Sequence, residues 1–145
     1  MELNKFSKKL KNFYKNNIDT IKYDFLNWLI GIQEDTPLPY EINTVCFIIK
    51  KESALYSLSY NGEEVLVKLN KLLPNNYIPL EGEFFWCKPL FTLDSLSKSE
   101  IVKRNFLLFL INDLLSYFLN KKESKFLKNK TIIYGFYNEK PIYFN

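Results

Sequence analysis

The chain has 145 residues, a formal net charge of +4 and no histidine. The absence of histidine excludes imidazole general bases, Ser-His and Cys-His nucleophile pairs, and histidine-containing zinc or iron sites. Hydrophobic residues make up 47% of the chain and aromatic residues 17%, a composition that excludes long disorder and predicts one domain over residues 1–145 with a large core. One arginine and one alanine, beside abundant lysine, asparagine and isoleucine, are typical of an AT-rich bacterial genome.

The first predicted element is an amphipathic helix over about residues 3–32. Apolar side chains recur every three or four positions from Leu3 to Ile32, and most of the lysines fall outside that stripe. Gly31 and then Thr36-Pro37 end the helix, because proline cannot continue the hydrogen-bond ladder. The segment has no apolar secretory core, and no apolar run in the chain is long enough to span a bilayer, so we expect a cytoplasmic protein.

The period then changes to two, which predicts strands. Residues 44–49 form the first strand, and residues 54–60 and 63–69 form a hairpin around Asn61-Gly62, a pair typical of a type I′ turn. This turn places Tyr60 opposite Glu63. The sheet then has one dry face and one open, mostly wet face that carries Ser57 and Ser59.

The segment 73–91 is the predicted binding surface. It holds three of the six prolines, is longer than a simple connection requires, and contains a short strand in the sequence GEFFWC. Alternation along this strand sends neighbouring aromatic side chains to opposite faces, so at least one is expected to face outward. The candidate binding residues are Tyr77, Phe84, Phe85, Trp86 and Lys88.

A second helix is predicted from about Lys98 to Leu119, beginning at a capping box formed by Ser97 and Glu100. It is apolar on nearly every side, so we expect it at the centre of the core. A last hairpin crosses Asn138-Glu139, and Pro141 places its final strand at a sheet edge. The predicted fold is α+β: an antiparallel sheet of about five to six strands, packed by the long N-terminal helix and the buried central helix, in the order α-β-β-β-(β)-α-β-β.

Basic charge lies in two blocks, each with a net charge of +4, at residues 1–23 and 121–130. Such blocks are typical of the solvated face of amphipathic helices, and they also fit an anionic partner such as nucleic acid. The lone arginine argues against base-specific readout. The candidate basic patch consists of Lys5, Lys8, Lys9, Lys15, Lys121, Lys122, Lys125 and Lys128.

Signals for catalysis are weak. The carboxylate pairs are Glu34-Asp35, Glu63-Glu64 and Glu81 with Glu83; adjacent residues on a strand point apart, so only the last pair can converge on an ion. Cys46 and Cys87 are too far apart in sequence for a metal knuckle and read as small core residues. No glycine-rich phosphate loop is present. We therefore expect no enzymatic activity, no cofactor and no metal.

The sequence favours a small protein that binds another macromolecule, through the open sheet face or the 73–91 segment. Secretion chaperones and toxin-neutralising immunity proteins have this size and mix of elements, which is an analogy of fold rather than of motif. The alternatives are a nonspecific nucleic-acid-binding protein that uses the lysine blocks and a metal-dependent hydrolase that uses paired carboxylates. A protein partner is expected, and the apolar content also favours a homodimer.

Overall fold

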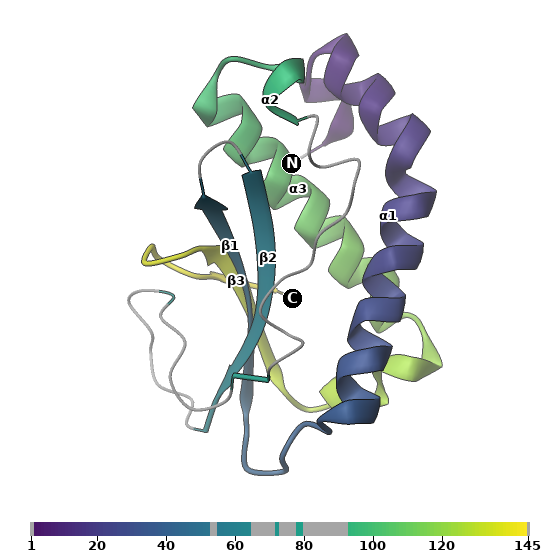
Figure 1. Ribbon diagram of the computed structural model, residues 1–145, viewed down its shortest axis with the longest axis vertical. Helices are drawn as coiled ribbons and strands as arrows, with labels where there is room; N and C mark the ends of the chain where they lie inside the picture. The colour runs from purple at the N-terminus through teal and green to yellow at the C-terminus, as the bar shows by residue number, and fades with distance from the viewer. Residues whose placement is uncertain (1, 53–54, 65–71, 73–77, 80–92, 145) are drawn as a thin grey trace.

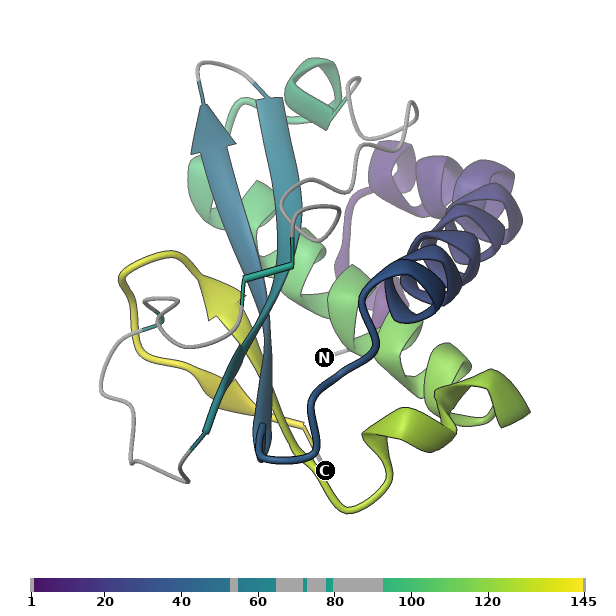
Figure 2. The same ribbon diagram turned by 60° about the horizontal axis from the view of Figure 1, so that its bottom comes forward.

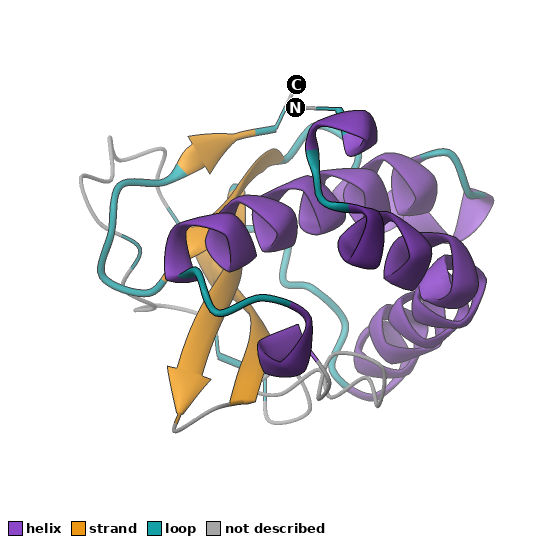
Figure 3. Ribbon diagram, turned by 90° about the horizontal axis from the view of Figure 1, so that it is seen from above, coloured by secondary structure: helices purple, strands orange, loops and turns teal. Residues whose placement is uncertain are grey.

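A computed structural model describes residues 2–52, 55–64, 72, 78–79 and 93–144. The four strands of these residues form one sheet in the order β2-β1-β3-β4, and helices α1 and α3 lie together on one side of it (Figure 1, Figure 3). The predicted α+β class is confirmed. In chain order the elements are the 3-10 helix η1 (Leu3–Lys5), α1 (Lys8–Asp35), β1 (Thr44–Glu52), β2 (Leu55–Glu63), α2 (Leu93–Leu96), α3 (Glu100–Leu119), the 3-10 helix η4 (Lys122–Leu127), β3 (Thr131–Phe136) and β4 (Ile142–Tyr143).

The sheet is mixed, so the predicted antiparallel sheet of five to six strands is wrong in its strand directions and is not matched in its count. Strand β1 pairs with β2 antiparallel and with β3 parallel, and β3 pairs with β4 antiparallel. Helix α3 carries the chain back across the sheet, so β3 starts at the same end as β1 (Figure 1). The strand predicted within 82–87 lies outside the described residues.

The hairpin predicted around Asn61-Gly62 is also wrong. Strand β2 continues straight through these two residues, and Tyr60 lies opposite Phe47 rather than opposite Glu63. Nine consecutive residue pairs join β1 to β2, and this long ladder with buried side chains outweighs the local preference of an Asn-Gly turn. The second strand was predicted over 63–69; Glu63 belongs to β2, and residues 65–69 lie outside the described residues.

The two long helices confirm the predicted periodicities. Helix α1 begins at Ser7, whose hydroxyl accepts a hydrogen bond from the Leu10 amide at 3.3 Å, and it ends before Thr36-Pro37. Gly31 lies inside it, so the prediction that Gly31 helps to end the helix is wrong. Helix α3 begins at Ser99, which caps the Val102 amide at 3.3 Å, so the predicted cap at Ser97 is wrong. Because α2 ends at Leu96, Ser97 belongs to the turn between two helices, where its hydroxyl accepts from the Ser99 amide.

Aromatic contacts join both helices to the sheet. Phe106 of α3 is fully buried, and its ring meets the ring of Phe6 edge-on with centroids 5.3 Å apart. Phe25 of α1 lies 6.0 Å from Phe47 in β1 and 6.1 Å from Phe118 in α3. One core therefore lies between the two helices and the sheet (Figure 2).

The second face of the sheet is covered as well, which corrects the predicted open face. Ser57 and Ser59 are buried, with 6% and 1% of their surface exposed. Leu72 is held against this face because its amide donates to the Glu139 carbonyl at 2.8 Å and its carbonyl accepts from the Asn138 amide at 2.9 Å. The buried residues of this smaller cluster are Cys46, Ile48, Leu72 and Ile133. Both faces of the sheet therefore carry core residues, and the exposed residues of the described strands are Lys51, Leu55 and the two residues of β4.

An ionic network fixes the start of α3 to the sheet. The Nζ of Lys103, a residue that is only 4% exposed, lies 2.6 Å from Asp94 and 2.9 Å from Glu100. Glu100 also accepts from Lys51 at 2.7 Å and from the Tyr56 hydroxyl at 2.9 Å. The hydrogen bonds from Lys103, Lys51 and Tyr56 lower the pKa of Glu100 to about 2, and those to Asp94 and Glu100 raise the pKa of Lys103. A buried cation is thereby paired with two carboxylates.

Phe106→Ala is expected to lower the free energy of unfolding by about 3–5 kcal/mol, because the substitution removes a fully buried ring and leaves a cavity. Urea denaturation followed by circular dichroism measures the change. Ile101→Ala on the same helix is the matched control: Ile101 is 73% exposed, and its truncation should change stability by less than about 0.5 kcal/mol. Equal losses in the two variants would contradict the described core.

Glu100→Gln is expected to make the stability of the protein to urea depend less on pH in the acid range. A folded-state pKa of about 2, below the ordinary 4.5, means that ionised Glu100 stabilises the fold above about pH 5 and loses this effect as the pH falls toward 2. Urea midpoints measured between pH 5 and pH 2.5 should therefore fall less steeply for Glu100→Gln than for the wild type. Parallel profiles would contradict the network.

Candidate functional site

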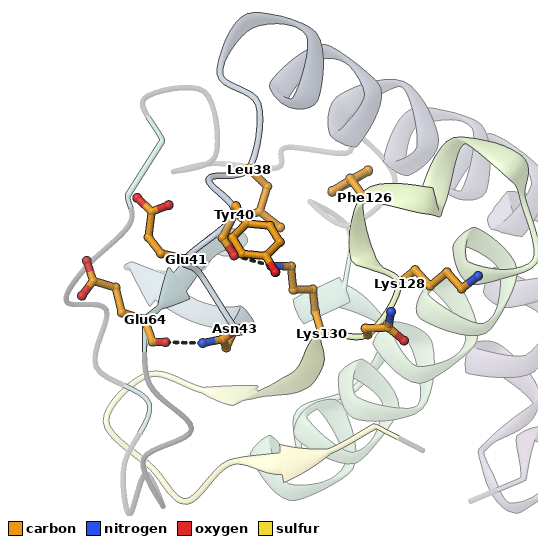
Figure 4. A pocket seen from close by; sticks show the side chains of 9 residues that line it. Leu38, Tyr40, Glu41, Asn43, Glu64, Phe126, Lys128 and Lys130 are labelled. Carbon is orange, nitrogen blue, oxygen red and sulfur yellow. Dashed lines mark hydrogen bonds between the residues drawn. The ribbon is translucent and has the colours of Figure 1, made fainter.

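A hollow lies at the amino-terminal ends of the parallel strands β1 and β3. Its volume is about 830 Å³, and it is bounded by the α1–β1 connection, the end of β2, η4 and the segment that leads into β3 (Figure 4). We call it the Tyr40 hollow. Its lining residues are Leu38, Tyr40, Glu41, Asn43, Glu64, Phe126, Lys128, Asn129 and Lys130.

Tyr40 is the most exposed large hydrophobic residue of the described chain, with 94% of its surface accessible. Its backbone is nevertheless held in place. The Nζ of Lys130 donates to the Tyr40 carbonyl at 3.0 Å and to the Ile42 carbonyl, and it lies 5.6 Å from the centroid of the Tyr40 ring. The Ile42 amide donates to the Pro39 carbonyl at 3.1 Å, which closes the turn. The ring is therefore displayed from a fixed turn.

Asn43 fixes the floor of the hollow because it joins three strands. Its amide donates to the Glu63 carbonyl at 3.0 Å, and its carbonyl accepts from the Thr131 amide at 2.9 Å. Its side-chain amide donates to the Glu64 carbonyl at 2.6 Å (Figure 4). The starts of β1 and β3 and the end of β2 are thus tied together directly beneath Tyr40.

Charges of both signs border the hollow. Glu41 and Glu64 are exposed on one side of it, and exposed Lys128 lies on the other, with Lys130 between them (Figure 4). Asn129 lies between the two lysines with φ at 68°, a left-handed conformation that asparagine tolerates better than most residues. The lining therefore offers hydrogen-bond donors, acceptors and an aromatic ring, and it is not uniformly basic.

The lysines of the predicted basic patch are all exposed, but they do not gather in one place. Lys5, Lys8, Lys9 and Lys15 lie in η1 and the first turns of α1, where Phe6 meets Phe106 near the start of α3. The other four lie in or beside η4, where Phe126 meets Phe118 near the end of α3. The two ring contacts lie 12 residues apart on α3, which is about 18 Å at 1.5 Å per residue. Only Lys128 reaches the Tyr40 hollow.

Tyr117 accounts for part of the second block without any ligand. Lys121 and Lys22 lie 4.7 and 5.4 Å from the centroid of its ring. Lys22 also lies 3.9 Å from Asp113, which accepts a hydrogen bond from the Tyr14 hydroxyl. Burial and the contact with Asp113 raise the pKa of Tyr14, so its hydroxyl stays a donor. These contacts hold α1, α3 and the start of η4 together.

The predicted binding residues Tyr77, Phe84, Phe85, Trp86 and Lys88 lie outside the described residues, as do Cys87 and the carboxylates of Glu81 and Glu83. Their role stays a prediction.

The structure also places the described acidic residues and Cys46, which are the groups that could serve as metal ligands or as a nucleophile. Glu63 is buried whereas Glu64 is exposed, so this pair does not converge. Burial first, and then Glu63, raise the pKa of Cys46 to about 12, which keeps the thiol protonated and poorly nucleophilic at neutral pH. Within the described ranges, no three cysteine or acidic side chains meet in a geometry suited to a metal ion. No helix of the described chain is both long and apolar enough to cross a membrane.

Tyr40, Asn43 and Lys130 were not among the residues predicted to form a site. The segment before β1 was interpreted only as the end of the first helix. The two prolines that precede the aromatic and the acidic residue are nevertheless an ordinary signal for an exposed turn. Lys130 and Tyr40 are separated by 90 positions in the chain. Their contact depends on the parallel pairing of β1 with β3, which the sequence pattern did not indicate.

Comparison of the chain with known protein families, curated proteins and solved structures finds no match. Function is therefore argued from the geometry and chemistry of the molecule itself.

Lys130→Met is expected to loosen the turn beneath Tyr40, because methionine keeps an apolar stem but loses the bonds to both carbonyls. We expect a loss of about 1–2 kcal/mol in unfolding free energy and faster hydrogen exchange of the Ile42 amide, measured by NMR. Lys128→Met is the matched control, since it removes the same charge from the same hollow and should leave Ile42 unchanged. Equal exchange rates in the two variants would contradict the described role of Lys130.

Proposed function

We propose that this protein is a non-enzymatic module that binds a protein partner through the Tyr40 hollow. The observation that carries the proposal is a tyrosine that is 94% exposed on a turn held by Lys130. Tyrosine is among the residues that dominate binding energy at protein interfaces. A fixed backbone reduces the ordering cost of association, so a preorganised aromatic side chain is suited to this role.

The mixed charge of the hollow supports a protein partner over a polyanion. Glu41 and Glu64 would repel a nucleic-acid backbone, whereas a protein surface can present both signs in a complementary arrangement. The hydrogen bonds of Asn43 to the Glu63 and Glu64 carbonyls hold the backbone that carries Glu64 beside the hollow. The proposed class is that of small proteins that act by occupying a partner, such as chaperones or toxin-neutralising immunity proteins.

Affinity capture with three baits tests this proposal. Wild-type protein, Tyr40→Ala and Tyr23→Ala are used on nuclease-treated native lysate, and the captured proteins are quantified by mass spectrometry. Tyr23, on α1, is 65% exposed and serves as the matched tyrosine. At least one captured protein should fall roughly tenfold or more with Tyr40→Ala and stay constant with Tyr23→Ala, as expected for an interface hot spot.

Identical capture by the two variants would contradict the proposal. The nucleic-acid alternative predicts a different result: capture that vanishes after nuclease treatment, and retention on a polyanion column that depends steeply on salt.

A further inference from the structure

A second pocket, of about 430 Å³, lies at the opposite ends of β1 and β3, where the two parallel strands terminate. In sheets with parallel strands, ligands commonly bind in the crevice beyond the carboxyl ends of these strands. Residues from β1, from the start of α3 and from the β3–β4 turn meet here. Its lining includes Lys50, Lys51, Arg104, Phe136, Tyr137 and Glu139.

Arg104 is the only arginine in a chain that otherwise uses lysine for its cations. Its guanidinium carbon lies 3.8 Å from the centroid of the Phe136 ring, so the planar group stacks on the aromatic face. A terminal amino group of Arg104 donates to the carboxylate of Glu139. Lysine can neither stack in this way nor present a planar fork of donors to a carboxylate. This position therefore uses properties specific to arginine.

The lining of the pocket has an excess of cations. Lys50, Lys51 and Arg104 line it together with one acidic residue, Glu139, and Lys51 is already paired with Glu100. The Nζ of Lys50 lies 5.2 Å from the centroid of the Tyr137 ring, and Lys50 is in none of the ion pairs found among the described side chains. Arg104 and Glu139 are 38% and 50% exposed, so their ion pair is weak and can be exchanged.

Exposed apolar side chains lie in this pocket and at the same end of the sheet. Tyr137, in the lining, is 47% exposed, and Ile101 in the first turn of α3 is 73% exposed. Leu55, at the start of β2 and paired with Glu52, is 39% exposed at the same end of the sheet. Apolar groups spread around a cationic centre suit a polypeptide with acidic and apolar side chains better than an isolated small anion.

We propose that this pocket binds an acidic segment of a protein partner, with one partner carboxylate on Arg104 and a second one on Lys50, on the other side of β1. The carboxylate of Glu139, already on Arg104, shows where such a group would lie. The proposal rests on the protein-binding role but uses the end of the sheet opposite to the Tyr40 hollow, so each surface can fail its test without the other.

Fluorescence anisotropy with a short, fluorescein-labelled, glutamate-rich peptide tests the assignment at moderate salt. Arg104→Gln should weaken binding roughly tenfold, and Arg104→Lys should weaken it measurably because the planar fork is lost. Glu139→Gln should strengthen binding roughly threefold by removing the internal competitor. Lys15→Gln is the matched control, because it removes one exposed charge far from the pocket, and Tyr40→Ala should leave peptide affinity unchanged.

Three results would overturn the proposal. Equal losses for Arg104→Gln and Lys15→Gln would show only general electrostatic attraction. Unchanged or weaker binding by Glu139→Gln would show that Glu139 does not occupy the place of a ligand. Complete displacement of the peptide by equimolar inorganic phosphate would assign the pocket to small oxyanions instead. If Arg104→Gln lowers the thermal midpoint, Lys50→Gln replaces it, with the same weakening expected.

Discussion

The fold depends on the burial of α3, a helix that is apolar on nearly all sides and so must be covered on more than one. Its side chains Leu107, Leu110 and Leu114 face the sheet beside Ile49 and Leu58, and α1 supplies the cover on its other side. Because α3 returns the chain across the sheet, β3 starts beside the start of β1 and runs parallel to it. The two ends of the sheet therefore differ: the Tyr40 hollow lies at one end and the Arg104 pocket at the other.

Local patterns predicted the elements but not how they pair. The three-to-four periodicity of α1, the apolar content of α3 and the final hairpin with its bend at Asn138 follow from residues close in sequence, and all are confirmed. The turn predicted at Asn61-Gly62 failed because a local preference of this kind is weaker than the ladder between β1 and β2. The contact of Lys130 with Tyr40 could not be predicted without the parallel pairing. The predicted binding segment at 73–91 lies outside the described residues.

The placement of buried and exposed groups leaves the two ends of the sheet as the proposed binding surfaces. Both faces carry buried residues, including Ser57 and Ser59, which alternation alone assigned to a wet face. The short outer strand β4 follows Pro141, which has no amide donor and so discourages further strand pairing at this edge. The exposed lysine blocks flank α3 at its two ends and are partly explained by contacts with Tyr117. A soluble surface requires neither the exposed ring of Tyr40 nor an arginine at position 104. Tyr40 and Arg104 are therefore the side chains that we assign to binding.

The central claim is that the Tyr40 hollow contacts a protein partner, and photo-crosslinking in the native cell tests it most directly. A benzoylphenylalanine is incorporated at position 40 in one version of the protein and at position 23, on the exposed surface of α1, in another. The account predicts a discrete crosslinked species of higher mass at position 40 that is resistant to nuclease and absent at position 23. No crosslink at position 40, or the same species at both positions, would contradict it.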